Sequence, residues 1–245
     1  MKNYIRISFI FIWTFIMSLI AGLCLLIGGK NRGPRWYNTS GKVWSWVIIH
    51  FCCIELRVSG IEKIKDLKDV IFTPNHMSHF DILFLYLALP GQIRFVFKQE
   101  LGEIPVFGWA LRRSGNITVD RESLKLSTVK SVVATLKLGN SIVMFPEGTR
   151  SFDGKLREFK EGPFVLGFMS KAQIVPVTIN GSFWVHNKVN PNIVNSGNVE
   201  VIIHEPIECY NYAKPSDKAE KALAIDMLKK KTFWTIKKDY IVQKV

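Results

Sequence analysis

The chain has 245 residues, of which 48% are hydrophobic and 12% aromatic, and its formal net charge at pH 7 is +13. This length and composition predict one large domain with a substantial core and exclude a disordered chain. The positive charge indicates an anionic partner, which could be membrane phospholipid, nucleic acid or a phosphorylated ligand, and does not choose among them.

An uncharged apolar segment lies near the start of the chain. Residues 7–29, ISFIFIWTFIMSLIAGLCLLIGG, carry no charged side chain, and roughly 20 apolar residues suffice to cross a bilayer. A cleaved signal peptide would have a shorter apolar part and a small-residue cleavage site, and the segment shows neither. A second apolar run at 43–54 is too short to span. We therefore expect residues 1–57 to form a membrane-embedded helical hairpin that anchors the chain, either crossing the bilayer or lying half embedded in it.

Positive charges and cysteines bear on the location of the rest of the chain. Basic residues flank the first apolar segment on both sides, which only slightly favours a cytoplasmic main domain. The cysteines, Cys24, Cys52, Cys53 and Cys209, form no Cys-x-x-Cys pair and suit a reducing compartment. We expect a membrane location with the functional site at the cytoplasmic face.

Strand and helix patterns alternate in the remaining part, residues 58–245. The strand-like runs are 70–73, 94–97, 141–145, 173–179 and 198–204. Between them, residues 80–89 are apolar on all sides, as in a buried helix. Residues 129–136 carry an apolar stripe at helical spacing, and Gly139 would end this second helix. This alternation predicts an α/β fold, a single domain with a mostly parallel sheet flanked by helices.

Two details refine this prediction. Pro176 lies inside the fourth run, in IVPVTINGS at 174–182, and suggests an edge strand or a bulge. The lysine-rich tail, residues 216–245, is typical of an exposed amphipathic helix, with membrane contact as a second possibility.

The stretch NHMSHFD, residues 75–81, follows a buried strand and a proline. Ser78 and Asp81 stand three residues apart before an apolar run, which is typical of a helix start. Side chains of a first turn lean back toward the helix N-terminus, so Asp81 would approach His76. An imidazole that donates to a carboxylate keeps its other nitrogen available to take a proton from a hydroxyl. His76 and Asp81 are therefore candidates for a general base and its orienting acid.

Two other interpretations of this stretch stay open. His76, His79 and Asp81 could ligate a divalent metal ion, although no further His, Cys or acidic cluster of recognised spacing completes such a set. The stretch could also be a polar helix start and nothing more. The His–Asp spacing alone does not decide among the three.

Two further blocks add cations and a tight turn. The first, residues 97–121, is punctuated by Gly and Pro, and its basic residues are Lys98, Arg112, Arg113 and Arg121. The second, MFPEGTRS at 144–151, ends a buried strand. Gly148 permits close approach of the backbone to a ligand, and Arg150 offers a planar fork suited to phosphate.

Together with the block around Pro176, these segments resemble the glycerophospholipid acyltransferase family, in particular its lysophosphatidic acid acyltransferases. The similarity covers roughly residues 70–182. The matching positions are Asn75, His76, Ser78 and Asp81, then Lys98, Glu100, Leu101, Ile104, Pro105 and Gly108, then Phe145 through Ser151 with Phe159, Lys160 and Gly162, and finally Val175 to Val177. Glu161 departs from the pattern, since relatives often carry a basic residue there.

The resemblance implies transfer of an acyl chain from an acyl thioester, on coenzyme A or acyl carrier protein, to the sn-2 hydroxyl of lysophosphatidic acid, giving phosphatidic acid. His76 would be the general base and Asp81 its orienting acid, with no acyl-enzyme, because a thioester is already activated. No Gly-x-Ser-x-Gly nucleophile motif occurs in the sequence. The thioester would be a co-substrate, and no bound cofactor or metal is expected.

The resemblance also implies a set of substrate-binding residues, namely Lys98, Arg121, Glu147, Gly148, Thr149 and Arg150. Arg150 and Lys98 would clamp the acceptor phosphate, and Glu147 would position the glycerol or the turn itself. Backbone amides near Gly148 could hold the developing oxyanion. Arg121 would serve the same phosphate or a surface.

The implied partners are the phospholipid bilayer, the lysophospholipid acceptor and the acyl thioester, and nucleic acid is not required to explain the charge. Three alternatives remain. The acceptor could be another lysophospholipid headgroup, or the protein could be a membrane-bound metallohydrolase or a non-catalytic lipid carrier.

Overall fold

The computed structural model of the protein describes residues 2–65, 67–104, 107–119, 126–209 and 218–242. Its helices are α1 (Lys2–Ile27), α2 (Gly29–Phe51), α3 (Asp81–Ala88), α4 (Gln99–Glu103), α5 (Phe107–Arg113), α6 (Leu126–Lys137), α7 (Gly162–Ser170), α8 (Ser182–Val185) and α9 (Lys218–Asp239), with a 3-10 helix, η1 (Ile61–Ile64). Its strands are β1 (Ile54–Ser59), β2 (Ile71–Pro74), β3 (Ile93–Lys98), β4 (Ile117–Val119), β5 (Ser141–Val143), β6 (Ile174–Asn180) and β7 (Gly197–Ile203).

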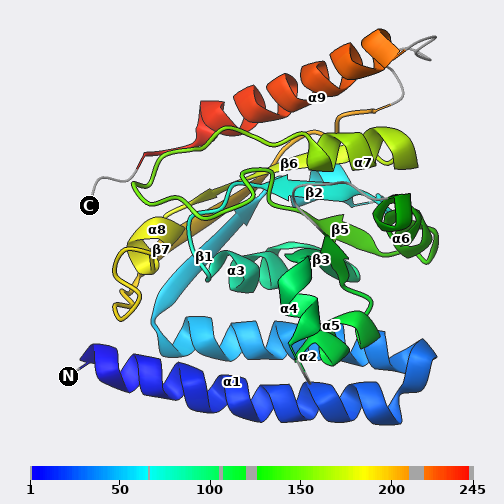
Figure 1. The fold of residues 1–245 in the computed structure, drawn as a ribbon. Coiled ribbons are helices and arrows are strands. Elements are labelled where there is room, and N and C mark those ends of the chain that lie inside the picture. The colour runs from blue at the N-terminus through cyan, green and yellow to red at the C-terminus, as the bar shows by residue number, and fades with distance from the viewer. Residues whose placement is uncertain (1, 66, 105–106, 120–125, 210–217, 243–245) are drawn as a thin grey trace.

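These strands form one seven-stranded sheet in the order β1-β7-β6-β2-β5-β3-β4. Neighbouring strands are parallel except for β6 and β7, which are antiparallel. Helices cover both faces, with α2 and α3 on one face and α6, α7 and α9 on the other (Figure 1). The predicted α/β domain with a mostly parallel sheet flanked by helices is therefore confirmed.

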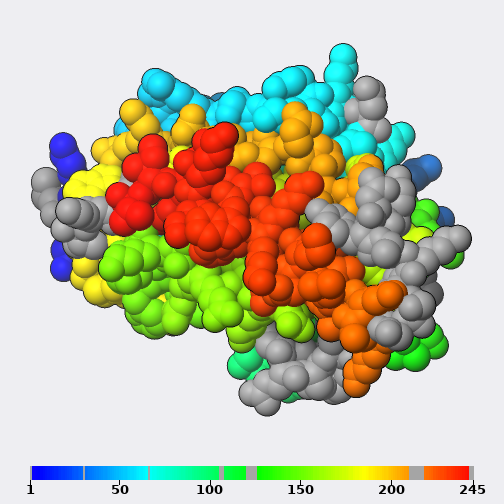
Figure 2. Space-filling view, turned by 90° about the horizontal axis from the view of Figure 1, so that it is seen from above, coloured from blue at the N-terminus to red at the C-terminus, as the bar shows by residue number. Residues whose placement is uncertain are grey.

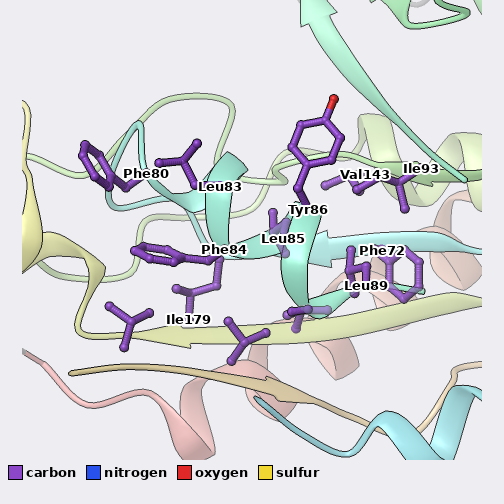
Figure 3. Close-up of a cluster of buried hydrophobic side chains, with 14 of the residues drawn as sticks. Phe72, Phe80, Leu83, Phe84, Leu85, Tyr86, Leu89, Ile93, Val143 and Ile179 are labelled. Carbon is purple, nitrogen blue, oxygen red and sulfur yellow. The ribbon is translucent and has the colours of Figure 1, made fainter. Parts of the chain in front are cut away.

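Strand β2 shows how the sheet is buried on both sides. Ile71 packs with residues of α6 and α7, whereas Phe72 belongs to the large cluster around α3 on the other face. Successive side chains of a strand point to opposite faces, so a doubly covered strand is apolar throughout. In Figure 3, Phe84 of α3 points toward Ile179 of β6, and Leu89 lies beside Phe72. This packing holds α3, and with it the start of the helix at Asp81, against the sheet.

The N-terminal hairpin lies along the base of the domain (Figure 1). By length and composition, α1 could cross a membrane, and only 11% of its most apolar window is buried. Its exposed large side chains recur along one broad face and include Tyr4, Ile5, Phe11, Ile12, Phe15, Leu19, Leu23, Leu26 and Ile27. Helix α1 therefore presents a long apolar surface away from the sheet.

Helix α2 is integrated into the domain. The buried Asn38 side chain accepts a hydrogen bond from the backbone N–H of Ile93 at 3.1 Å. Gly41 lets the Tyr86 ring of α3 pack closely, since a Cβ at that position would lie 2.8 Å from the ring. The predicted boundary after residue 57 falls inside β1, which is part of the sheet. The division into an anchoring part and a catalytic part stays a prediction.

Pro176 lies in a central strand. Strand β6 pairs with β2 on one side and β7 on the other, and all seven of its residues are buried. The expectation of an edge strand or a bulge is therefore wrong. Proline has no backbone N–H to donate. The Pro176 carbonyl still accepts the His204 N–H at 3.1 Å, so β6 stays hydrogen-bonded at this position.

Helix α9, drawn orange to red, crosses the face seen from above, opposite the hairpin (Figure 2). It buries Ile225, Leu228 and Ile236 in a cluster with Phe164 of α7 and Ile174 of β6. The lysine-rich tail is thus a helix that packs on the domain, but it is not clearly amphipathic, because its outer side carries Leu223, Met227 and Trp234 among the lysines.

Candidate active site

Parallel strands bring several of the predicted residues to one edge of the sheet. Strand β2 leads into His76, β3 ends at Lys98, and β5 leads into the turn that contains Glu147 and Arg150. Both β2 and β3 pair in parallel with β5, so their carboxyl ends lie at the same edge. Ligands of open α/β sheets bind at such an edge.

Asn75 fixes the backbone just before His76. Its buried side chain donates to the Ile179 carbonyl at 3.0 Å and accepts the Ile179 N–H at 2.7 Å. A side-chain amide thereby extends the pairing of β2 with β6 beyond the end of β2. The chain can turn toward α3 there without leaving those backbone groups of β6 unpaired.

The side chains of His76 and Asp81 lie in direct contact. The distance between His76 Nδ1 and Asp81 Oδ2 is 2.9 Å, and Oδ2 also accepts the N–H groups of Met77 at 2.7 Å and Ser78 at 2.8 Å. Ser78 Oγ accepts the Phe80 N–H at 3.0 Å, and α3 begins at Asp81. The carboxylate thus fixes both the imidazole and the loop that leads into α3. An N-cap at Ser78, which the sequence suggests, is wrong, because Phe80 occupies the cap position and no side chain among the described residues caps the helix.

This pairing sets the roles of the two ring nitrogens of His76. A carboxylate oxygen can only accept, so Nδ1 carries the proton and Nε2 is the nitrogen left to take one. The ring stacks on Phe145, with centroids 3.8 Å apart, and the side chain is 16% exposed. Asp81 is fully buried. The imidazole is thus held in one orientation with restricted access to water.

Glu147 holds the His76 loop to the turn after β5. Its Oε1 accepts the backbone N–H of His76 at 2.7 Å, and its Oε2 accepts that of Arg157 at 2.9 Å. The side chain is 2% exposed, and burial raises its pKa to about 7 despite the two hydrogen bonds, which lower it. Since both oxygens are bound to backbone, the geometry favours positioning of the turn over direct contact with substrate. A second link is the Ser151 N–H, which donates to the His76 carbonyl at 3.0 Å.

Gly148 and Thr149 form the middle of this turn. Gly148 has a φ of +70°, and a Cβ there would lie 3.1 Å from the Lys160 side chain, so glycine suits both the conformation and the space. The Gly148 N–H donates to the Phe145 carbonyl at 3.1 Å. The Gly148 N–H is therefore already used within the turn, and it could donate to an oxyanion only if the turn opened. The Thr149 side chain is partly exposed beside it.

Arg150 is a partly buried cation close to the His–Asp pair. Burial lowers the pKa of its guanidinium, and the nearby Asp81 carboxylate opposes that shift. Within the described part of the chain, the guanidinium has no hydrogen-bond acceptor or ion-pair partner. Burial and then the charge of Arg150 lower the pKa of His79 to about 4, so His79 is neutral at pH 7. An anion bound here would find guanidinium N–H groups that no described side chain accepts, with the charge of Asp81 nearby.

The other predicted cations are less closely tied to this pair. The Lys98 side chain is 51% exposed and forms an ion pair with Glu100, and no contact of Lys98 with His76 or Arg150 is recorded among the described residues. Its part in one clamp with Arg150 stays a prediction. Arg121 and Pro105 lie outside the described residues.

The alternative of a metal site can be compared with the same geometry. In the ranges that the structure describes, no three His, Cys, Asp or Glu side chains are grouped so as to hold a metal ion. Asp81 Oδ2 is already occupied by three N–H donors. Those donors suit an oriented imidazole better than a metal ligand.

A cavity of about 1270 Å³ lies behind the turn. Its walls include the turn itself, the ends of three strands at Val96, Val119 and Met144, and Lys160 and Lys229. Apolar and charged groups both line it, so it could accommodate an amphipathic ligand next to Phe145 and Glu147.

Sequence reasoning missed several residues that shape the site. His186, at the end of α8, lies with its ring 5.9 Å from that of His79 and 5.3 Å from Phe80. Tyr240, just beyond α9, donates from its hydroxyl to the Gly154 carbonyl at 2.6 Å and lies 3.3 Å from Met77 Sδ. No local pattern marks either residue, because only the folded chain brings them to this edge.

Comparisons with known proteins show what the chain is similar to. The 1-acyl-sn-glycerol-3-phosphate acyltransferase of Haemophilus influenzae is 32% identical over 94% of this chain and 95% of its own length. That of Salmonella typhimurium is 34% identical over 84% of this chain and 86% of its own length. The chloroplastic enzyme LPAT1 of Arabidopsis thaliana is 32% identical over 71% of this chain, which spans about half, 49%, of that longer protein.

A solved structure shares the fold. The 1-acyl-sn-glycerophosphate (LPA) acyltransferase PlsC from Thermotoga maritima superposes with a TM-score of 0.75 at 21% identity, covering 96% of both chains. The family model described as Acyltransferase matches residues 55–180, which run from β1 to the end of β6 and include His76, Asp81, Glu147 and Arg150. The chain therefore belongs to the acyltransferase family.

Proposed function

We propose that this protein transfers an acyl chain from an acyl thioester to the sn-2 hydroxyl of lysophosphatidic acid, giving phosphatidic acid. The observation that carries the proposal is the His76–Asp81 pair, which stands beside the Arg150 cation at the ligand-binding edge of an acyltransferase-family domain. The names of the bacterial and chloroplastic relatives support the choice of acceptor.

The proposed reaction needs one proton carrier. His76 Nε2 takes the proton of the acceptor hydroxyl while that oxygen attacks the thioester carbonyl carbon. The carbon–sulfur bond then breaks, and the imidazolium returns the proton to the leaving thiolate. Asp81 stabilises the imidazolium and holds the ring through its 2.9 Å contact with Nδ1. No acyl-enzyme forms, because the acceptor hydroxyl attacks the activated acyl group directly.

The acceptor phosphate is assigned to Arg150, with Lys98, Thr149 and Arg121 as further candidates. Arginine binds phosphate oxygens through two parallel N–H groups, and the Arg150 guanidinium has no acceptor among the described residues. Glu147 acts indirectly, by holding the backbone of His76. The acyl donor, on coenzyme A or a carrier protein, is a co-substrate.

A membrane location follows from the chemistry of acceptor and product, which reside in the bilayer. Helix α1 exposes a long apolar face, while α2 packs on the domain. We propose that this face enters the lipid and that the site works at the cytoplasmic surface of the membrane.

One assay separates this proposal from its rivals. Purified protein is incubated with acyl-CoA or acyl carrier protein thioester and lysophosphatidate, and both free thiol and lipid products are followed. The acyltransferase releases thiol and phosphatidic acid in equal amounts, and chelators leave the rate unchanged. A lipid carrier would release no thiol, and a metallohydrolase would lose its activity to chelators. If another lysophospholipid reacts faster than lysophosphatidate, that lysophospholipid is the preferred acceptor instead.

A further inference from the structure

Exposed apolar side chains cluster at the end of the molecule where the site lies. In and after α8, Trp184 is 52% exposed, Val189 55% and Ile193 39%. Phe152, two residues beyond Arg150, is 52% exposed. Single exposed apolar residues are ordinary, whereas a group of them marks an interaction surface. We call these four residues the α8 patch.

The α8 patch is joined to the N-terminal hairpin. The Arg6 guanidinium of α1 donates to the Val194 carbonyl at 2.7 Å. The Trp184 ring lies 3.6 Å from where a Cβ on Gly197 would be, and Gly197 pairs with Ile54, three residues after the end of α2. Figure 1 shows α8 and the loop after it at the same end of the molecule as the chain N-terminus.

The loop that carries most of the patch therefore meets the N-terminal part of α1, which also bears the exposed apolar face. At its N-terminal end this face carries Tyr4, which is 78% exposed, and Ile5, which is 55% exposed. The contact between Arg6 and Val194 lies immediately beside them.

The patch also borders the candidate active site. The Lys188 ammonium lies 4.0 Å from the centroid of the Phe152 ring, which connects the loop after α8 to the loop after Arg150. His186, in the same loop, packs against Phe80 and His79, next to the His–Asp pair. A lipid that reached this patch would be near His76.

We propose that the α8 patch is a second bilayer contact, inserted at the level of the lipid headgroups beside the mouth of the active site. Tryptophan suits that depth because it has an apolar body and a polar N–H. Lys188 supplies a cation for lipid phosphate. The patch and α1 together would hold the site against the membrane, so that the acceptor need not leave the bilayer fully. This role rests on the proposed function for its purpose, but its test does not require activity.

The test uses full-length protein on vesicles of phosphatidylcholine and phosphatidylglycerol, with and without brominated acyl chains, which quench nearby tryptophan. Trp184→Phe is compared with Trp234→Phe, a matched control whose side chain is 61% exposed and which belongs to α9, the helix on the face opposite the hairpin (Figure 2). The chain has 7 tryptophans, so each substitution changes the quenched fraction of the total fluorescence.

If Trp184 lies in the bilayer, Trp184→Phe lowers the quenched fraction, because a quenched emitter is lost. Trp234→Phe raises that fraction, because an unquenched emitter is lost. An unchanged or raised fraction in Trp184→Phe, or no binding of the wild type to vesicles, overturns the proposal.

A second measurement connects the patch to acceptor supply. We expect Trp184→Ser to raise the apparent KM for lysophosphatidate in vesicles about tenfold, the change that roughly 1.4 kcal/mol of lost membrane contact gives, and to leave the KM for a monomeric short-chain acceptor unchanged. Trp234→Ser is the control. An equal rise for both acceptors would contradict a membrane role. If the wild-type protein is inactive but Trp184 is quenched by the brominated lipid, the proposed function is wrong and the proposed lipid contact is still supported.

Discussion

At the scale of single residues, the proposed mechanism depends on one carboxylate oxygen. Asp81 Oδ2 accepts three N–H groups, from the His76 ring and from the backbone of Met77 and Ser78. This arrangement could be predicted because all its parts lie within seven residues of sequence. The links through Glu147 and Ser151 could not, since they join segments about 70 residues apart whose contact depends on the pairing of β2 with β5.

Asp81→Asn tests this oxygen. Asparagine keeps an amide oxygen for the three N–H donors and places its NH2 at the position of Oδ1, which has no partner among the described residues. The negative charge that stabilises the imidazolium is lost, so we expect kcat to fall about a hundredfold or more, with little change in acceptor binding. Asp226→Asn on α9, where the carboxylate pairs only with lysines, should match the wild type. Near-normal turnover in Asp81→Asn would show that another group orients His76.

Glu147 gives a prediction about pH. Burial raises its pKa in the folded protein from 4.5 to about 7, so the folded state binds this proton more tightly than the unfolded chain. Its contribution to stability is therefore fully present below about pH 4.5 and is lost as the pH rises through 7.

The measurement is the unfolding free energy of wild type and Glu147→Gln between pH 4.5 and 8. We expect the wild type to lose roughly 3 kcal/mol relative to the glutamine variant across this window, since each pKa unit is worth about 1.4 kcal/mol. A difference that does not change with pH would mean that the carboxyl group titrates normally.

At the scale of elements, the C-terminal end of α9 braces the site. Beyond the helix, the Tyr240 hydroxyl contacts the loops after β5 and β2, at Gly154 and Met77. The Ile241 N–H donates to Asn180 at the end of β6. The residues just after α9 therefore tie together two loops and the end of β6 at the active edge.

Tyr240→Phe removes one of these ties. Loss of a single hydrogen bond costs about 1 kcal/mol, so we expect a stability decrease of this size and faster hydrogen exchange of the Ser151 amide, which donates to the His76 carbonyl. Tyr4→Phe, at a side chain that is 78% exposed on α1, is the control. Unchanged exchange at Ser151 would show that the site does not depend on α9.

Elements with strong local signals could be predicted from sequence. Helix α6 follows its amphipathic stripe and ends at Lys137, two residues before Gly139, whose φ of +75° suits the turn after a helix C-terminus. Strands β1 and β4 were not predicted. Strand β4 has only three residues, and β1 lies at the sheet edge, where polar and exposed residues interrupt the apolar pattern. The edge position expected for Pro176 was wrong because one proline can be accommodated in a central strand by its neighbours.

At the scale of the whole molecule, the net charge of +13 does not by itself locate the membrane-binding face. Many lysines lie on α9, on the face opposite the hairpin (Figure 2). Replacing Lys230, Lys231 and Lys238 by glutamine lowers the net charge from +13 to +10. We expect affinity for anionic vesicles to remain within about twofold in a co-sedimentation assay, because charges beyond a Debye length of about 10 Å are screened. A large loss would place α9 at the membrane.

The fold as a whole brings one oriented imidazole close to a cation suited to phosphate, in a domain whose helix α1 exposes a long apolar face. The central claim is that His76 removes the proton from the acceptor hydroxyl. Its most direct test is the turnover of folded His76→Ala with acyl thioester and lysophosphatidate. We predict a loss on the order of a hundred- to ten-thousand-fold, the range for a positioned base, with acceptor binding retained. Turnover by this variant at the wild-type rate would contradict the account.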